Sequence, residues 1–199
     1  MIVLGIDSSP NNCGWCAWDT ADGAKPVVGV YHPGKYGDNN LLLLRDVRKW
    51  ALRMIDDHSP VSVWVESVTP SPQRMNTRTW IDQMSVLAGI DNACELNDLA
   101  CYQCGPGQWR KRFLGSASGS GEELKIKAVK RVMEIGVLTD NDHIAEAIGI
   151  CEFGMASADR EYLKRTEADR VRRELAIQRE VMQGVGKPLI NKKNVWRGK

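Results

Sequence analysis

The sequence predicts an α/β fold in which a five-stranded mixed sheet is flanked by helices. Two apolar runs, residues 1–9 and 61–68, are rich in β-branched side chains, as buried strands are. A helical pattern separates the two runs, and a helical crossover is typical of neighbouring parallel strands. Two shorter strand patterns follow the first run and are separated by turn residues, which predicts an antiparallel meander.

The first predicted strand ends in an acid. Four apolar residues of the strand precede Asp7, and two serines follow it. An isolated carboxylate is costly to desolvate, so a carboxylate at the end of a buried strand usually faces a cation, a hydrogen-bond donor or a metal ion. The alternative is that Asp7 only turns the chain, because Asp is a common turn residue. Acids that arrive later at the same point would favour the first interpretation.

The next elements complete the meander and lead to the second buried strand. Strands are predicted over residues 13–18 and 27–31, followed by a helix that begins at Asn39 or Asn40 and ends at Asp57. The fourth strand, over residues 61–68, carries Glu66 near its carboxyl end. A crossover would place this strand parallel to the first one and beside it, so Glu66 is expected near Asp7.

The second half of the chain is predominantly helical. A loop with two prolines precedes a helix over about residues 77–96, and a fifth strand follows over residues 99–104. The remaining predicted elements are a short helix at 106–114, a flexible segment at 115–121, a helix at 122–135 ended by Gly136, a helix within 139–152, and a helix of mixed charge from about 155 to 182.

The beginning of the helix within residues 139–152 carries three candidate site residues. Asp142, His143 and Glu146 fall in its first two turns. Offsets of three and four residues place Asp142 and His143 on the same helix face as Glu146. His143 titrates near working pH, so it could bind or protonate near a phosphate, whereas the alternative is a capping or surface histidine.

Composition places the chain among soluble proteins with one domain and an appendage. Its 199 residues and 43% hydrophobic content are sufficient for a proper core. The longest apolar run ends at Arg45 after four residues, far short of a membrane span, and the first strand has no basic region before it. We therefore expect a cytoplasmic protein, in a bacterium or in a virus-infected host cell, with no membrane partner.

Charge and cysteine spacing each leave two interpretations. Residues 155–199 hold twelve Lys and Arg against six Asp and Glu, a net charge of +6, and the remainder of the chain is at −4. A basic arm on an acidic body suits a polyanion, and a solvated helical tail is the alternative. Cys13 and Cys16, with Cys101 and Cys104, have zinc-site spacing. Both pairs lie in strand patterns, which favours buried reduced thiols instead.

Two strand-end acids and acids on a late helix form a pattern that fits divalent-metal chemistry on phosphodiesters. Mg²⁺ prefers oxygen ligands, and two such ions about 4 Å apart can activate a water and stabilise the leaving oxygen. The order of the acids along the chain is more informative than any one of them.

Five stretches resemble motifs of the RuvC family of Holliday junction resolvases, which belongs to the RNase H-like superfamily. They read GIDSSPNNCGW, VWVES, GPGQWRKRFLG, GEELKIKAVKRV and DHIAEAIGI. The resemblance implies an RNase H-like nuclease domain over residues 1–156 and a basic helical C-terminal extension over residues 157–199. It leaves open whether the chain is a phage-type member.

The resemblance also implies the site residues. Asp7, Glu66 and Glu146 match the family's metal-binding acids, and His143, or Asp142 beside it, completes a site for two Mg²⁺ ions. Arg110 and Lys125 match basic residues of the DNA cleft. The implied reaction is hydrolysis of a phosphodiester by an activated water, which leaves 5′-phosphate and 3′-hydroxyl ends.

The chain departs from the family's pattern at three positions. His143 replaces the usual Asp, a change that members of the family accept, and Glu146 replaces Asp. The family's aromatic wedge falls on Thr69, so the opening of a junction would need another side chain such as Met75 or Trp80. Imidazole suits Mn²⁺ better than Mg²⁺, so Mn²⁺ is expected to be accepted as well.

Basic residues near the predicted site are candidates for DNA binding. The DNA-binding candidates are Arg74, Arg78, Arg110, Lys111 and Lys125, with Arg112 as a further basic residue of the same predicted helix as Arg110. The alternative for these side chains is a solvated helix face. Trp109, which lies among them, is expected in the core rather than stacked on a base.

The sequence therefore predicts a crossover junction endodeoxyribonuclease, a metal-dependent endonuclease that cleaves Holliday junctions or other branched DNA. A four-way junction is two-fold symmetric and one chain holds one site, so a homodimer is expected. The alternatives are a less selective branch or flap nuclease, a catalytically silent DNA-binding module and, since a G-I-D strand also begins them, an actin-like ATPase. The last needs two such domains, and this chain has room for one.

Overall fold

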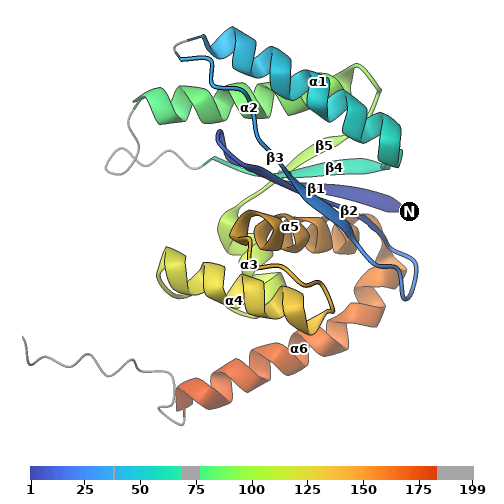
Figure 1. Ribbon diagram of the computed structural model, residues 1–199. Coiled ribbons are helices and arrows are strands. Elements are labelled where there is room, and N and C mark those ends of the chain that lie inside the picture. The colour runs from blue at the N-terminus through green and yellow to red at the C-terminus, as the bar shows by residue number, and fades with distance from the viewer. Residues whose placement is uncertain (38, 69–76, 183–199) are drawn as a thin grey trace, which may run out of the picture.

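A computed structural model describes residues 1–37, 39–68 and 77–182 of the chain (Figure 1). A five-stranded sheet with the strand order β3-β2-β1-β4-β5 forms its centre. The first three strands pair antiparallel, whereas β4 and β5 run parallel to β1. The strands are β1 (Ile2–Ser8), β2 (Cys13–Asp19), β3 (Val27–Tyr31), β4 (Ser62–Glu66) and β5 (Cys101–Cys104). The predicted mixed sheet is confirmed.

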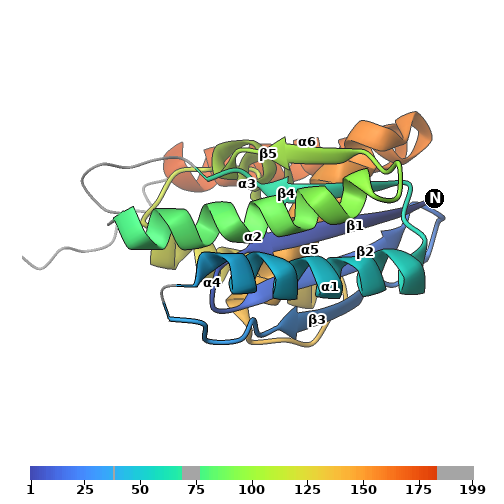
Figure 2. The same ribbon diagram turned by 90° about the horizontal axis from the view of Figure 1, so that it is seen from above.

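Helices cover both faces of the sheet. Figure 1 shows α1 and α2 on one face, and α5 against the other face with α3, α4 and α6 outside it. Seen from above, α1 and α2 run side by side across the sheet (Figure 2). The helices are α1 (Asn40–His58), α2 (Thr77–Glu95), α3 (Pro106–Leu114), α4 (Gly121–Glu134), α5 (Asp142–Ala158) and α6 (Arg160–Met182). The polypeptide therefore forms three layers, with the sheet between two helical layers.

Local sequence signals set the helix boundaries. The side chain of Asn39 accepts a hydrogen bond from the Leu42 amide at the start of α1, and Asn141 caps α5 in the same way. Ser120 and Glu123 form a capping box on α4. Gly136, with a φ of +86°, follows α4 in the left-handed conformation that ends many helices.

Side chains of β1 alternate between the two helical layers. Val3 belongs to the apolar cluster formed with α3, α4 and α5, whereas Leu4 and Ile6 belong to the cluster formed with α1 and α2. Each of these three side chains is at most 1% exposed. This alternation is the two-residue period of a strand that is buried on both faces.

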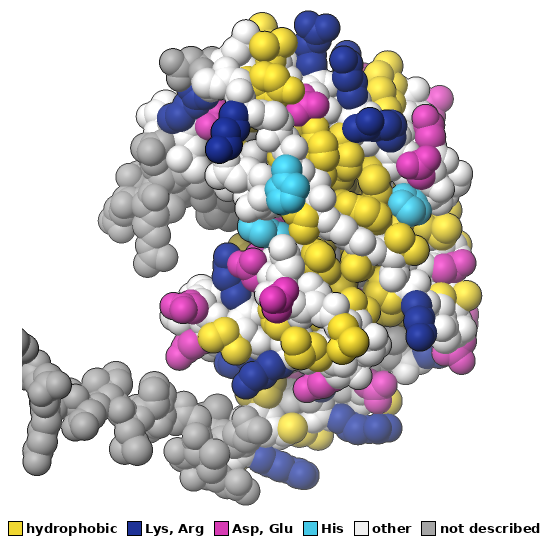
Figure 3. Space-filling model, in the orientation of Figure 1, with side chains coloured by type: hydrophobic (Ala, Val, Ile, Leu, Met, Phe, Trp, Pro, Cys, Tyr) yellow, Lys and Arg dark blue, Asp and Glu magenta, His cyan; other side chains and the backbone are white. Residues whose placement is uncertain are grey.

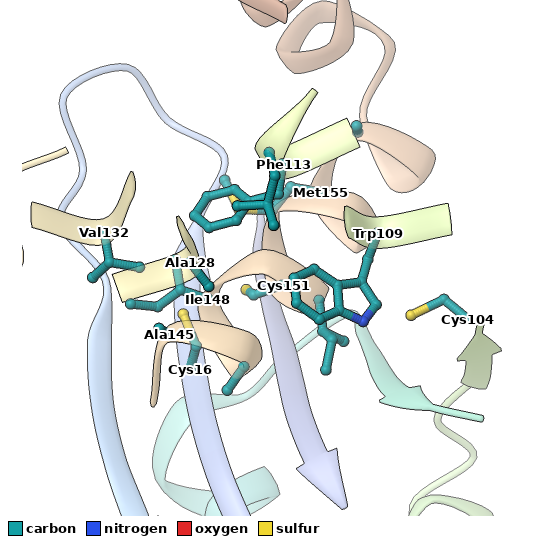
Figure 4. Packing of buried hydrophobic residues seen from close by; sticks show 14 of the residues in the cluster. Cys16, Cys104, Trp109, Phe113, Ala128, Val132, Ala145, Ile148, Cys151 and Met155 are labelled. Carbon is teal, nitrogen blue, oxygen red and sulfur yellow. The ribbon is translucent and has the colours of Figure 1, made fainter. Parts of the chain in front are cut away.

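Helix α5 is the centre of the helical layer on the face opposite α1 and α2, called the lower layer here. Its residues Ile148, Cys151 and Met155 pack against Trp109 and other side chains from α3 and α4 (Figure 4). A Cβ atom added to Gly149 would lie 2.7 Å from the Trp109 ring, so the missing side chain lets α3 approach α5. The short helix α3 is thereby fixed against α5, beside the carboxyl ends of the central strands.

Two glycines let α5 lie directly on the sheet. A Cβ atom on Gly5 would lie 2.5 Å from the backbone nitrogen of Cys151, and a Cβ atom on Gly14 would overlap the carbonyl oxygen of His143. Both positions are therefore closed to larger side chains unless the helix moves. They place the N-terminal turn of α5 at the carboxyl end of β1.

The cysteines do not form the zinc site that their spacing allowed. Cys13 packs in the cluster with α1 and α2, whereas Cys16 packs in the cluster with α5, and Cys101 and Cys104 divide between the two clusters in the same way. All six cysteines are free thiols. Residues three apart on a strand point to opposite faces, which is why neither pair can chelate one ion.

The first half of α6 packs on the rest of the molecule. Tyr162 is 8% exposed within the apolar cluster that also contains side chains of α3, α4 and α5. Arg112 donates a hydrogen bond to the Thr166 hydroxyl over 2.9 Å. Arg165 donates a hydrogen bond to the Thr20 carbonyl. The division of the chain at residue 156 stays a prediction. Of the helices in the described ranges, none has the length and apolarity needed to span a bilayer.

Candidate active site

Asp7 lies one residue before the end of β1 and shares the face of Val3 and Gly5, which is the face that α5 covers. Its pairing partner on β2 is Gly14, whose missing side chain leaves room for the first turn of α5. His143 therefore reaches Asp7, and its Nδ1 lies 2.6 Å from Asp7 Oδ2. Asp7 is 7% exposed, so this is a contact of a buried carboxylate.

Glu66 is the last residue of β4. The parallel register pairs Ile6 with Val65, so Glu66 lies beside Asp7, as the crossover predicted. Burial is the main cause that raises the pKa of Glu66 to about 7, and the charges of Asp7 and Glu146 act in the same direction. A hydrogen bond of 2.7 Å from Trp109 Nε1 to Glu66 Oε1 opposes this shift.

Glu146 lies one turn after His143 on α5 and is 5% exposed. Burial, followed by the charge of Asp7, raises its pKa, and Arg110 lowers it. The Nη2 atom of Arg110 donates to Glu146 Oε1 over 2.8 Å. Three acids from β1, β4 and α5 are thus electrostatically coupled, because Asp7 destabilises the charged forms of both glutamates.

Asp142 and His143 have different partners, although they are adjacent. Lys125 on α4 contacts Asp142 Oδ2 over 2.5 Å, and this bond is the main cause that raises the pKa of Lys125. Burial would raise the pKa of Asp142, but the bond and the charge of Lys125 lower it. Of the two candidates for a fourth ligand, His143 contacts Asp7 and Asp142 contacts Lys125.

The predicted DNA-binding residues do not all face the acids. Arg110 binds Glu146, and Lys111 is exposed on α3. Arg112 points away from the acids and lies 3.1 Å from Glu152, because residues two apart on a helix face nearly opposite directions. Arg78 pairs with Asp82 over 2.9 Å. The remaining candidates on the loop, Arg74, Thr69 and Met75, lie outside the described residues.

A hollow of about 210 Å³ lies between the two strand ends and α2. Asp7, Ser8, Glu66 and Gln83 are among the residues that line it. Figure 3 shows the left edge of the molecule hollowed between the two helical layers, with acidic, basic and histidine side chains around it. Asp7 and Glu66 can therefore be approached from solvent, although Asp7 is almost fully buried.

Three residues that contact the site were not predicted as site residues, although Trp109 was correctly expected in the core. Trp109 holds Glu66 from within the core, Asn12 Nδ2 lies 3.4 Å from His143 Nε2, and His32 Nδ1 lies 2.8 Å from Asn12 Oδ1. The sequence signal for Asn12 is its place in the turn directly after Asp7. His32 has a weaker signal, because only the strand register shows that it lies beside Asn12.

The donor set fits a hard divalent cation, but its members have other partners. Within the ranges that the structure describes, no three Asp, Glu, His or Cys side chains lie close enough together to chelate a metal ion. Asp7, Glu66 and Glu146 offer the oxygen ligands that Mg²⁺ prefers. Arg110 now holds one of them, so a cation at the site would replace Arg110 on Glu146 and reduce the repulsion among the acids.

Comparison with known proteins identifies the fold. No protein-family model matches the chain, and no curated protein matches it by sequence. Among solved structures it is similar to RuvC from Thermus thermophilus, with a TM-score of 0.63 and 17% identity over 79% of this chain and 96% of that one. The same protein in complex with a Holliday junction substrate matches with a TM-score of 0.62 and 18% identity over 76% and 90%.

A viral protein shows the same likeness at a lower level. The structure of the fowlpox virus resolvase with Holliday junction DNA matches with a TM-score of 0.51 and 14% identity, over 79% of this chain and 99% of that one. The described chain thus has the RNase H-like fold of RuvC-type resolvases. The resemblance stated from the sequence motifs is confirmed at the level of the fold.

Proposed function

We propose that this chain, which has a RuvC-like resolvase fold, is a metal-dependent endonuclease that cleaves Holliday junctions or other branched DNA. One observation carries the proposal: Asp7, Glu66 and Glu146 come from three separate elements, and the charge of Asp7 raises the pKa of both glutamates. Asp7 and Glu66 also line one hollow. Clustered acids of this kind are expensive to bury unless a cation joins them. Phosphodiester hydrolysis is one reaction that metal ions held by such a cluster can catalyse.

Each site residue has a specific role in this proposal. Asp7, Glu66 and Glu146 would hold two Mg²⁺ ions, or Mn²⁺, with His143 at the edge of the site. The ions would supply Lewis acidity and an activated water, leaving 5′-phosphate and 3′-hydroxyl ends. Arg110 and Lys125, which pair with acids in the free protein, would turn to the phosphates of the bound strand.

A branched substrate is supported by the likeness to two resolvases whose structures contain Holliday junction DNA. A two-fold symmetric junction favours two active sites related by a dyad, so the protein is proposed to act as a homodimer. The first half of α2 offers a surface for such a contact, because Trp80, Ile81 and Met84 are each 38–40% exposed there. Apolar side chains grouped in this way often mark an interface.

The activity test compares a synthetic four-way junction with a linear duplex of the same sequence, in the presence and absence of Mg²⁺. We expect nicks at matching positions in two junction strands, little cutting of the duplex and no turnover of ATP. Asp7→Asn should abolish cutting and largely retain DNA binding. The matched control is Asp22→Asn, which makes the same change in an exposed turn.

Two results would contradict the proposal. Asp7→Asn that cuts at a rate near wild type would show that the site is elsewhere. Binding of the junction by the wild-type protein without any cutting, in either Mg²⁺ or Mn²⁺, would indicate a DNA-binding module instead.

The dimer is tested by sedimentation at micromolar concentration, with and without junction DNA. Met84→Glu should dissociate the dimer, since it introduces a charge into the exposed apolar part of α2. Leu138→Glu is the control, because Leu138 is also exposed but lies in the loop before α5. A protein that stays monomeric on the junction and still cuts both strands in one binding event would exclude the dimer.

A further inference from the structure

A chain of polar contacts extends from Asp7 to the surface. Asp7 Oδ2 lies 2.6 Å from His143 Nδ1, His143 Nε2 lies 3.4 Å from Asn12 Nδ2, and Asn12 Oδ1 lies 2.8 Å from His32 Nδ1. His143 and Asn12 are half-buried, whereas His32 is exposed. The outer two residues, Asn12 and His32, are not among the expected metal ligands.

The sheet explains why these residues meet. Cys13 and Tyr31 are partners in the antiparallel pairing of β2 with β3, so Asn12 and His32 follow as the next opposed pair. Gly14, two residues after Asn12, receives the first turn of α5 and therefore places His143 above Asn12. The contacts thus follow from backbone register rather than from flexible surface side chains.

The chemistry of the amide determines the direction of the chain. With the Asn12 amide oriented as in the structure, its oxygen accepts the hydrogen bond that His32 Nδ1 donates, because an amide oxygen only accepts. The amide nitrogen of Asn12 only donates, so His143 Nε2 must carry a lone pair. The proton of a neutral His143 ring then lies on Nδ1, which donates it to Asp7.

We propose that Asn12 and His32 are positioning residues that fix the proton of His143 on Nδ1, so that this ring donates to the Asp7 carboxylate. The importance of this tautomer for cleavage rests on the proposed function, but the tautomer itself does not. With the proton on Nδ1, this nitrogen cannot ligate a cation. Ligation through Nδ1 would require the Asn12 amide to rotate by half a turn, with His32 changing from donor to acceptor.

The chain of contacts from Asp7 through His143 and Asn12 to His32, called the relay here, ends at a second hollow on the surface. Asn12 and His32 line a second hollow of about 490 Å³, together with Lys35 and Arg78. A group bound there would contact His32 without touching Asp7. The relay would therefore transmit occupancy of this hollow to His143 through one rotatable amide.

The test uses the metal-free, DNA-free full chain with ¹⁵N-labelled histidine. Long-range ¹H–¹⁵N correlation distinguishes a protonated ring nitrogen from one with a lone pair. The chain has only three histidines, so removing each in turn assigns the spectrum. The contact with Asp7 raises the pKa of His143, so the pH is increased until its ring signals stop changing. The neutral His143 ring is expected to carry its proton on Nδ1. A wild-type spectrum with the proton on Nε2 would overturn the proposal without any variant.

Two variants separate positioning from a general structural effect. Asn12→Asp keeps the shape but offers only acceptors, so the Nε2 signal of His143 should move to the range of protonated nitrogens. His32→Ala frees the amide to rotate, so this signal should become intermediate between the two ranges. Asn11→Asp, which adds the same charge at the neighbouring exposed residue, should leave the spectrum unchanged.

Opposite results have a clear meaning. Asn12→Asp with an unprotonated Nε2 would show that Asn12 does not set the tautomer, and an unchanged spectrum in His32→Ala would remove His32 from the relay. Neither measurement depends on DNA cleavage, so this proposal and the proposed nuclease activity can fail separately.

Discussion

The two faces of the central sheet have different content although the same strands supply both. The face towards α1 and α2 is covered by an apolar cluster that includes Leu4, Ile6 and Ile90. The buried acids Asp7, Glu146 and Glu152 all lie in the layer of α5. One residue of strand register separates a side chain that stabilises the fold from one that forms the site, because successive residues of a strand point to opposite faces.

The layer of α5 can hold buried acids because its backbone is fixed closely against the sheet. Gly5 and Gly14 bring α5 onto β1 and β2, and Gly149 brings α3 onto α5. Trp109 and Arg110 on α3 then reach the glutamates from a rigid support. The layer of α1 and α2 therefore contributes mainly hydrophobic stability, whereas the layer of α5 gives up part of that stability to position charged side chains.

The largest effect is expected where backbone contact positions the site. In Gly14→Ala the new Cβ would overlap the His143 carbonyl, so α5 must move away from the sheet. We expect a loss of about 3 kcal/mol in the free energy of unfolding and of at least about a hundredfold in junction cleavage. Urea unfolding and single-turnover cleavage measure the two effects.

The matched substitution on the other face is Gly89→Ala. Its Cβ would lie 2.8 Å from the Leu44 carbonyl, so it also forces two elements apart, here α1 and α2. We expect destabilisation but a normal cleavage rate for the folded protein. Equal losses of cleavage in both variants would remove the functional distinction between the two faces.

A cavity on the α1 and α2 face should affect stability alone. Ile90 is 1% exposed in the cluster of that face, so Ile90→Ala should cost about 2–5 kcal/mol in the free energy of unfolding. Cleavage per folded molecule should stay within about twofold of wild type, because the clustered acids lie on the side of the sheet that α5 covers. A tenfold loss in active folded protein would indicate coupling between the layers.

The acids should make stability depend on pH. The folded-state pKa of Glu66 is about 7, against an ordinary value of 4.5, so the folded protein retains a proton that the unfolded chain has lost. The free energy of unfolding should therefore fall as pH rises from about 4.5 to about 7, by at most about 3 kcal/mol from this group. Glu66→Gln should remove this contribution from metal-free unfolding curves.

Exposed Glu95→Gln provides the control for this measurement. It should leave the dependence of stability on pH as it is in the wild type. A Glu66→Gln protein whose stability falls as steeply as that of the wild type over the same range would show that Glu66 is ionised without penalty.

The smallest effect concerns the choice of metal. An imidazole suits Mn²⁺ better than a carboxylate does, so Mn²⁺ should support cleavage at least as well as Mg²⁺. His143→Asp should shift the ratio of the two rates towards Mg²⁺ by a few-fold to about tenfold. An unchanged ratio would show that His143 does not contact the metal ion and acts only through Asp7, which it contacts in the free protein.

The arrangement of strands and helices and the approximate place of the site could be predicted from the sequence. Strand and helix periods gave the five strands, and the crossover rule placed Glu66 beside Asp7. The helix pattern placed His143 and Glu146 on one face of α5. These features follow from local periodicity and from the order of the elements along the chain, and both can be read from the sequence. The metal ions, the junction preference and the dimer remain proposals.

The partner of each acid became known only from the folded structure. Trp109 binds Glu66, Arg110 binds Glu146, and Asn12 reaches His143 across more than a hundred residues of sequence. These contacts depend on how closely α5 and α3 approach the sheet, which is set by glycines whose neighbours come from distant segments. Local patterns cannot encode that approach, because it results from the packing of side chains that meet only in the folded protein.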